Sequence, residues 1–340
     1  MKLLIFTQKV DKNDPTLGFF HTWIKELSKK SDSIAVVCLG KGQYDLPKNV
    51  TVYSLGKESG LSRLGYLKNL FHYLYLIRGS YDKVFVHMNE EYVLLCGLYW
   101  KIKNIPVYFW RNHPRGSLVT RVSVLLSKKV FCTSKDSFTA RFRKTVIMPA
   151  GIDTTIFKPI EGVVRKKYSV CMVGRVSPIK NIDLALPAIR ILVSWGFQVS
   201  LSIIGPIPKN DLKYLDSLRA YVKNYNLSNS ISFLEAVSPL ELAKVYSSYE
   251  VTLNLTDTGS FDKTIVEAAA CGSIPLVSNK SFSLLLPEVC IIEKSQEAVS
   301  EGIKRLLSAH EQIEIQKNLE TFVKAQSLTG LIDKLIVEMN

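Results

Sequence analysis

Short apolar runs alternate with longer segments of helical periodicity along the whole chain. In the first half the apolar runs are Leu3–Phe6, Ile34–Leu39, Val50–Tyr53, Val84–His87, Val107–Trp110, Val130–Cys132 and Val146–Met148. Helical patterns fall between several of them, at Phe19–Lys29, Leu64–Ile77 and Glu91–Lys101. In the second half the runs are Tyr168–Val173, Val199–Ile204, Ile231–Leu234, Val251–Leu255, Ile274–Val277 and Val289–Ile292. This alternation predicts an α/β protein whose strands form parallel sheets.

The stretch Pro149–Lys167 interrupts the rhythm with two prolines, two glycines and several charges. A chain of 340 residues is long enough for two domains with separate cores. We therefore expect a Rossmann-like domain at 1–150, a linker at 151–166, a second Rossmann-like domain at 167–310 and a helical tail at 311–340, with the two domains facing a cleft.

The net charge of +14 is concentrated in one half of the chain. Residues 1–160 carry 25 lysines and arginines against 11 aspartates and glutamates, whereas residues 161–340 carry 19 of each. The basic half should meet an acidic partner, such as an anionic membrane surface, a phosphorylated acceptor or nucleic acid. Two cationic, aromatic or apolar segments, Leu61–Gly79 and Leu118–Lys129, could lie on a membrane or could equally be core-packing helices. No nucleic-acid-binding module is recognisable, so we expect no nucleic acid partner.

Cysteine spacing and hydropathy favour a cytoplasmic location, and the charge asymmetry suggests a peripheral position on the inner face of the membrane. The six cysteines are far apart and form no C-x-x-C pair, which is typical of reduced core residues. The apolar run at Leu3–Phe6 is too short for a signal peptide. No run reaches the roughly 18 residues of a membrane helix, because the nearest, Tyr92–Trp110, contains Lys101, Lys103 and Pro106.

Two segments carry the chemistry. The first is V-G-R-V-S-P-I-K-N at Val173–Asn181, where a predicted strand ends and a helix begins. Gly174 permits a sharp turn, and Arg175 and Lys180 then stand at a helix N-terminus, where a phosphate binds well. The second is S-F-D-K-T-I-V-E-A-A-A-C-G at 260–272, in which Glu267 lies in an apolar, alanine-rich helix. A buried carboxylate needs partners, and two ribose hydroxyls would serve.

Together the two segments suit a ligand with a diphosphate and a ribose, which points to a nucleotide sugar and glycosyl transfer. No two aspartates form D-x-D, the pair that often holds a diphosphate through a metal ion. We therefore expect no metal and no cofactor, the two cations and the helix end supplying the positive charge. Of five histidines, His87 and His113 follow predicted strands, where ligands bind in open α/β sheets.

These motifs resemble those of the retaining GT-B glycosyltransferases of family four. Gly174, Arg175 and Lys180 match its G-R-x-x-x-x-K element, and Glu267, Ala268, Ala270 and Gly272 match the end of its E-x7-E-A-x-A-x-G element. Pro149–Asp153 with Phe157 is similar to its interdomain segment, and Thr7–Trp23 with Gly18 to its N-terminal glycine loop. The likeness covers nearly the whole chain and is strongest from Tyr168 to Gly272.

The resemblance implies a role for each matched residue. Arg175 and Lys180 would neutralise the leaving diphosphate, Glu267 would hold the ribose, and Gly18 and Gly174 would let the backbone approach the donor. Phe233 and Leu234 would flank the base, and Lys263 and Thr264 complete the expected donor-binding set. His113 would lie beside the transferred sugar.

The chain departs from the family pattern at two positions. Gly259 stands where the first glutamate of E-x7-E should be, and Asp262 replaces the usual glycine after Phe261. Because the missing carboxylate helps to hold the sugar in the family, we expect Asp262, with His113, to orient it. The expected catalytic set is thus His113, Asp262, Arg175 and Lys180.

We therefore expect a metal-independent, retaining glycosyltransferase that moves a sugar from a nucleotide diphosphate sugar to a glycan or lipid-linked acceptor bound by the basic half. Two alternatives stay open: a nucleotide-sugar epimerase of the same fold, and a non-catalytic protein that binds a sugar nucleotide or glycan. The base, the sugar, the acceptor, the linkage and the oligomeric state are left open.

Overall fold

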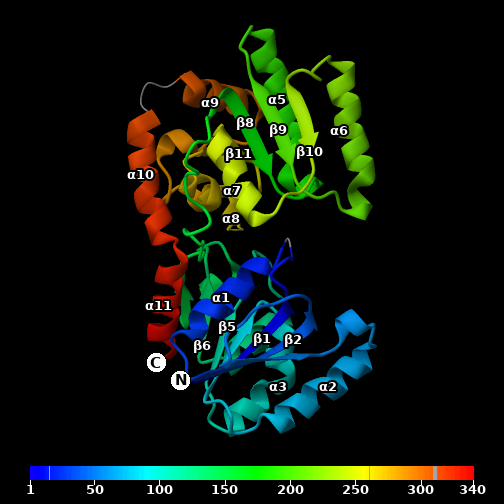
Figure 1. Ribbon diagram of the computed structural model, residues 1–340, viewed down its shortest axis with the longest axis vertical. Helices are drawn as coiled ribbons and strands as arrows, with labels where there is room; N and C mark the ends of the chain where they lie inside the picture. The colour runs from blue at the N-terminus through cyan, green and yellow to red at the C-terminus, as the bar shows by residue number, and fades with distance from the viewer. Residues whose placement is uncertain (15, 260, 309–311) are drawn as a thin grey trace. The chain divides into compact units, whose positions relative to one another are not determined.

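The computed structural model describes residues 1–14, 16–259, 261–308 and 312–340 and divides the chain into two compact units. The first unit comprises Met1–Gly151 and Leu328–Asn340, and the second comprises Ile152–Ser327. Each unit has a parallel β-sheet covered by helices, as the alternating pattern predicts (Figure 1). Ser260 and His310 lie outside the described residues.

The first unit is built on a seven-stranded sheet with the order β3-β2-β1-β4-β5-β6-β7, and its paired strands run parallel. The strands are β1 (Lys2–Val10), β2 (Ser33–Lys41), β3 (Val50–Ser54), β4 (Lys83–His87), β5 (Val107–Trp110), β6 (Lys129–Cys132) and β7 (Thr145–Ile147). Leu3–Phe6 of β1 is buried on both faces, because helices cover both sides of a parallel sheet.

Helices α1 (Gly18–Ser28) and α11 (Leu328–Met339) share one core with the sheet. Helices α2 (Arg63–Leu76), α3 (Glu90–Ile102) and α4 (Leu118–Leu126) contribute to a second core with the alternate strand residues. Because successive strand side chains point to opposite faces, α2, α3 and α4 cover the face opposite to α1 and α11 (Figure 1).

The second unit is built on a five-stranded parallel sheet with the order β10-β9-β8-β11-β12. Its strands are β8 (Lys166–Val173), β9 (Ser200–Ile204), β10 (Ile231–Leu234), β11 (Tyr249–Asn254) and β12 (Ile274–Val277). Its helices are α5 (Ile182–Ser194), α6 (Leu212–Asn224), α7 (Pro239–Ser248), α8 (Lys263–Ala270), α9 (Gln296–Ser308) and α10 (Gln312–Ala325).

Both strand orders place a topological switch point next to the first strand of the unit. In the first unit it lies between β1 and β4, and in the second between β8 and β11. Open α/β sheets bind ligands outside the carboxyl ends of the two strands at such a point. The two segments that the sequence predicts to bind the diphosphate and the ribose directly follow β8 and β11.

The structure differs from the expected segmentation in two places. The division falls at Gly151 and Ile152, and the expected helical tail is split, with α10 in the second unit and α11 in the first. Helix α11 joins the first unit because Leu331 and Leu335 are buried in its core. The expected strand Val289–Ile292 was wrong: a 3₁₀-helix occupies Glu288–Cys290 after Pro287, leaving an isolated bridge between Ile291 and Val277.

The six cysteines are all buried and carry no disulfide, as core residues should. Burial raises the pKa of the Cys171 thiol to about 12. No helix among the described residues is long and apolar enough to cross a membrane.

Candidate functional site

The loop after β8 forms a turn that suits an anion. Strand β8 ends at Val173, a 3₁₀-helix (η3) spans Pro178–Lys180, and α5 begins at Ile182. Asn181, between them, has a left-handed backbone (φ 50°) and donates from Nδ2 to the carbonyl of Leu255 (2.7 Å). This bond ties the start of α5 to the end of β11, so the two halves of the expected donor site are joined.

Gly205 was missed by the sequence reasoning. It follows β9, has a φ of 152°, and crosses Gly174 so closely that a Cβ on Gly205 would overlap the Gly174 carbonyl oxygen. The Gly174 amide in turn donates to the Ile204 carbonyl (3.0 Å). Only a residue without a side chain fits such a crossing. The I-G-P tripeptide after an apolar strand was the available signal.

Arg175 and Lys180 line a small pocket with Gly174, Asn254 and Leu255. Arg175 is exposed and forms no hydrogen bond or ion pair among the described residues. The Ser177 hydroxyl, between the two cations, is buried and has no hydrogen-bond partner among the described residues. A buried hydroxyl without a partner carries a desolvation cost that a ligand oxygen can relieve.

Lys180 forms an ion pair with Asp262, the N-cap residue of α8. The side chains are 17% and 14% exposed, so the pair is largely shielded from solvent. The Asp262 carboxylate also accepts from Asn254 Nδ2 (2.9 Å) and from the Thr264 hydroxyl (2.9 Å). Burial alone would raise the pKa of Asp262, but the Lys180 charge and these hydrogen bonds outweigh it and hold the pKa below its ordinary value of 3.8.

The lowered pKa makes the stability contribution of Asp262 depend on pH. The contribution is fully present above the ordinary value of 3.8 and is lost as pH falls through the lower pKa of the folded state. We expect Asp262→Asn to lower the free energy of unfolding by about 3 kcal/mol at neutral pH, because Lys180 loses its charged partner. The difference from the wild type should shrink as pH falls below about 4, which thermal or urea unfolding across pH measures.

Asp257→Asn is the matched control, because Asp257 pairs with Lys294 but is 70% exposed. We expect it to change the free energy of unfolding by less than about 1 kcal/mol. Equal losses from the two substitutions, or an Asp262→Asn loss that does not vary with pH, would contradict the proposed charge pair.

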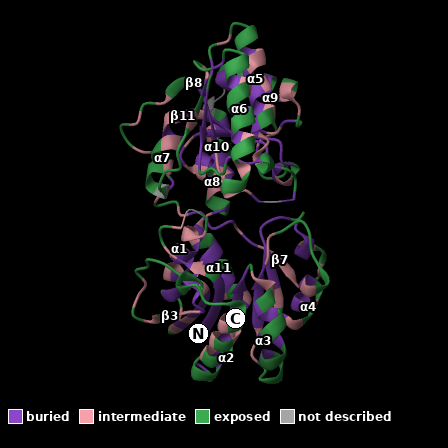
Figure 2. Ribbon diagram, turned by 90° about the vertical axis from the view of Figure 1, so that its right-hand side faces the viewer, coloured by how far each residue is buried: buried purple, intermediate pink, exposed green. Residues whose placement is uncertain are grey.

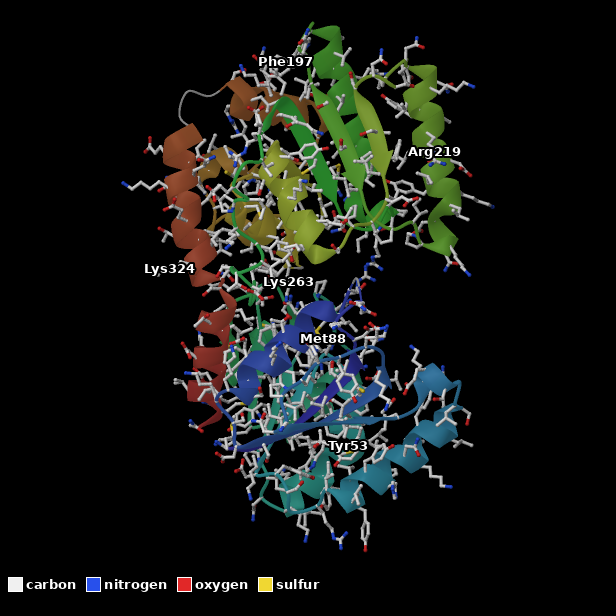
Figure 3. The ribbon with its side chains drawn as sticks, viewed as in Figure 1. Tyr53, Met88, Phe197, Arg219, Lys263 and Lys324 are labelled. Atoms are coloured by element: carbon white, nitrogen blue, oxygen red, sulfur yellow. The ribbon has the colours of Figure 1, made fainter. Side chains whose placement is uncertain are left out.

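Glu267 lies one helical turn after Lys263 on α8 and is half-buried. Burial raises the pKa of the Glu267 carboxyl and the charge of Lys263 partly offsets it, whereas burial lowers the pKa of the Lys263 ammonium. The charges of Asp262 and Lys180 also act on Glu267. The structure therefore brings Lys180, Asp262, Lys263 and Glu267 into one cluster of two cations and two acids (Lys263 is labelled in Figure 3).

The expected base-binding residues lie at the carboxyl end of β10, on the same edge of the sheet. Phe233 is half-buried and Leu234 is 47% exposed. The Gly205 amide donates to the Leu234 carbonyl (3.2 Å), so β10 adjoins the crossing of Gly174 and Gly205. The exposed apolar side chain of Leu234 thus comes from the strand next to the turn that contains Gly174 and Arg175.

Gly259 has a φ of 112°, in a region that side chains rarely adopt, and its amide donates to the Ser281 hydroxyl (3.1 Å). A glutamate there, as in the family pattern, would be strained. The backbone conformation at this position therefore suits the glycine of this chain and disfavours the glutamate of the family pattern.

Gly18 and His113 belong to the first unit, at the carboxyl edge of its sheet. Gly18 begins α1, and just before it the Asp14 carboxylate accepts from the Thr16 and Leu17 amides (2.9 and 2.8 Å) and from Lys9 Nζ (2.8 Å). His113 is exposed, and its Nδ1 accepts from the Arg115 amide (3.0 Å).

An ion pair holds the loop that carries His113. Arg111 Nε contacts Glu90 Oε2 at 2.8 Å, both side chains are 15% exposed, and Arg111 also donates to the Arg115 carbonyl (2.9 Å).

At the switch point of the first sheet, Met88 has a φ of 71° within a tight turn in which the Asn89 amide donates to the His87 carbonyl (2.9 Å; Met88 is labelled in Figure 3). Sequence reasoning missed these residues, because nothing in the local pattern marks them.

His87 lies in the core of the first unit. It is 2% exposed and stacks on Phe20 with ring centroids 4.0 Å apart.

In the described part of the chain, no three histidine, cysteine, aspartate or glutamate side chains gather as a set of metal ligands.

Comparisons with solved structures establish the fold. Anabaena Alr3699/HepE, solved in complex with UDP, superposes with a TM-score of 0.81 over 99% of both chains at 16% identity. WaaG, a glycosyltransferase involved in lipopolysaccharide biosynthesis, superposes with a TM-score of 0.70 over 99% of both chains at 13% identity. The chain therefore has the GT-B architecture of two Rossmann-like domains.

Curated relatives match part of the chain at low identity. The D-inositol 3-phosphate glycosyltransferase of Segniliparus rotundus is 26% identical over 146 residues, covering 41% of this chain and 32% of that protein. One component of human phosphatidylinositol N-acetylglucosaminyltransferase is 28% identical over 165 residues, covering 47% of this chain and 33% of that protein. Each match thus spans about a third of the relative's length. The family model for glycosyl transferases group 1 matches residues 153–324, half of the chain, and the chain belongs to that family.

Proposed function

We propose that this protein transfers a sugar from a nucleoside diphosphate sugar to a hydroxyl of a glycan or lipid-linked acceptor, with retention of configuration and without a metal ion. The observation that carries the proposal is that Arg175 and Lys180 line one pocket after β8, and that Lys180 also interacts with Asp262 and Glu267 of the segment after β11. These two segments flank the switch point of the second sheet, where parallel α/β sheets bind nucleotides.

The diphosphate would bind to the cationic side chains of Arg175 and Lys180. Arg175 is exposed and forms no ion pair among the described residues, and its planar fork suits two phosphate oxygens. Lys180 would share its ammonium between Asp262 and the diphosphate, and the Ser177 hydroxyl would gain a ligand partner. Preorganised cations of this kind stabilise the charge that develops on the leaving diphosphate, which is the role a metal ion plays in other transferases.

The rest of the nucleotide would follow the same edge of the sheet. Glu267 would accept hydrogen bonds from the ribose hydroxyls, which relieves the cost of its burial. Phe233 and Leu234 would flank the base. The Anabaena relative was solved with UDP and with UDP-glucose, which supports uridine diphosphate as the first nucleotide to test.

In the transfer step, the bond between the sugar's anomeric carbon and the phosphate oxygen breaks. A bond to the acceptor oxygen forms on the same face, and the acceptor proton passes to a phosphate oxygen of the leaving diphosphate. His113 and Asp262 would orient the sugar. Because Gly259 offers no carboxylate, we propose that this enzyme holds its sugar through different contacts from relatives with the full E-x7-E element.

The basic first half would receive the acceptor. Two relatives are named for acting on D-inositol 3-phosphate and phosphatidylinositol, both of which carry a phosphate. The excess of cations within residues 1–160 suits an acceptor with negative charge of this kind.

A transfer assay tests the proposal. The full chain is incubated with UDP-glucose, a chelator and candidate phosphorylated or lipid-linked acceptors, and UDP release and product anomer are followed by NMR. We expect acceptor-dependent UDP release with retention. Inversion would contradict the retaining mechanism, loss of activity in chelator would contradict metal independence, and interconversion of the sugar without transfer would favour the epimerase alternative.

A further inference from the structure

The outer faces of α2, α3 and α4 are apolar, although nothing in the described chain covers them. On α2, Leu64, Phe71 and Tyr75 are 77%, 53% and 66% exposed and lie on one stripe of the helix. On α4, Leu118 and Leu125 are 76% and 70% exposed. Figure 2 colours much of α2 and α3 as exposed.

Helix α3 is the clearest case, because it is apolar on both sides. Its inner residues Val93, Cys96 and Trp100 are buried against the sheet. Its outer residues Leu94, Leu98 and Ile102, spaced four apart, are 43%, 62% and 71% exposed. A helix that is apolar all round is normally buried on all sides. The exposed stripe of α3 is therefore a surface on which a partner could bind.

The three stripes belong to one surface. The inner residues of all three helices contribute to the same core, so their outer stripes point away from the same face of the sheet. Gly97 of α3 lets α4 approach, because a Cβ there would lie 3.0 Å from Leu126 Cδ1. We call the exposed residues of α2, α3 and α4 and the residues directly after these helices the α2–α4 face.

Cations surround the apolar residues of the α2–α4 face. The exposed cations are Arg63, Lys68, Arg78, Lys101, Lys103, Arg121 and Lys128. None of them forms an ion pair among the described residues. Helices α2 and α4 contain no acid, and of the two acids of α3, Glu90 is bound to Arg111, which leaves Glu91 exposed. The face is therefore both strongly basic and apolar.

We propose that the α2–α4 face docks this protein on the surface of an anionic lipid bilayer. Large apolar side chains that alternate with lysine and arginine suit the boundary between acyl chains and anionic headgroups. A second copy of the chain is a poor occupant, because two identical basic faces would repel each other. The proposal does not rest on the transfer reaction.

Vesicle flotation with the full chain tests the proposal. Vesicles of phosphatidylcholine alone are compared with vesicles that contain about one third phosphatidylglycerol. We expect binding to the anionic vesicles to be at least about tenfold stronger and to weaken as salt is raised. Leu98→Gln/Ile102→Gln and, separately, Lys68→Gln/Arg121→Gln should each lower that binding by at least about tenfold.

Matched control variants have the same kinds of substitution at exposed positions outside the α2–α4 face. Val337→Gln/Leu212→Gln replaces exposed apolar residues on α11 and α6, and Lys213→Gln/Lys223→Gln replaces exposed lysines of α6. Both controls should bind vesicles like the wild type, and UDP binding should be unchanged in all four variants. Equal binding to neutral and anionic vesicles, or equal loss in the controls, overturns the proposal. Self-association in the ultracentrifuge that only Leu98→Gln/Ile102→Gln abolishes would instead assign the face to a second copy.

Discussion

Lys180→Ala should weaken the binding of UDP more than any other single change, by about a hundredfold or more. The substitution removes a cation from the diphosphate site and leaves the shielded carboxylate of Asp262 without its charged partner. That carboxylate then repels the incoming diphosphate. Arg175→Ala should weaken UDP binding by about 10- to 100-fold without affecting folding, because Arg175 is exposed.

The ion pair between Lys180 and Asp262 leads to a more specific prediction for the double variant. Lys180→Ala/Asp262→Ala should bind UDP more tightly than Lys180→Ala alone, because the second change removes the repulsion that the first created. Calorimetry on the wild type, both single variants and the double variant measures this coupling. Arg219→Ala, at an exposed residue of α6 (labelled in Figure 3), is the control and should bind like the wild type. Additive losses in the double variant would show that Asp262 and Lys180 do not act as a pair in nucleotide binding.

Glu267→Ala should remove the recognition of the ribose, an effect as large as that of Arg175→Ala. We expect UDP affinity to fall by about 10- to 100-fold, the size of one or two hydrogen bonds to a charged group. The affinity for 2′,3′-dideoxyuridine diphosphate should change little, because that ligand lacks the hydroxyls that Glu267 would bind. Glu267→Gln keeps one acceptor oxygen and should lie between the wild type and Glu267→Ala.

The raised pKa of Glu267 adds a pH dependence. Because burial raises the pKa above its ordinary value of 4.5, the carboxyl takes up its proton at a higher pH than an exposed glutamate does. The UDP affinity of the wild type should therefore fall as pH is lowered through the weakly acidic range, and that of Glu267→Gln should fall less. Equal losses of UDP and dideoxy-UDP affinity in Glu267→Ala would instead mean that the substitution disturbs α8 and that Glu267 does not contact the ribose.

The local pattern was enough to predict the strands of both sheets, apart from the extra strand expected at Val289–Ile292, and to group three of the candidate site residues. Apolar runs such as Leu3–Phe6 have a strong signal because both faces of a parallel strand are buried. Gly174, Arg175 and Lys180 could be predicted as a unit because they lie within seven residues at a junction between strand and helix.

What the sequence did not reveal depends on contacts between distant segments. The Lys180 and Asp262 pair joins residues 82 apart, and it exists because β8 and β11 are neighbours in the sheet. Nothing in the sequence indicated that Asp262 is also bound to Lys180, Asn254 and Thr264, as the structure shows. The crossing of Gly174 and Gly205 likewise needs the pairing of β8 with β9. The helical pattern of the tail predicted α11 but could not say which core would bury Leu331 and Leu335.

Calorimetric titration of UDP and UDP-glucose into the full chain, in the presence of a chelator, tests whether the segments after β8 and β11 bind the diphosphate of a nucleotide sugar. We expect one saturable site per chain that binds without added metal, with an affinity that is lower by about 10- to 100-fold in Arg175→Ala. No heat with any nucleoside diphosphate, or equal affinity in the wild type and Arg175→Ala, would contradict binding at these segments.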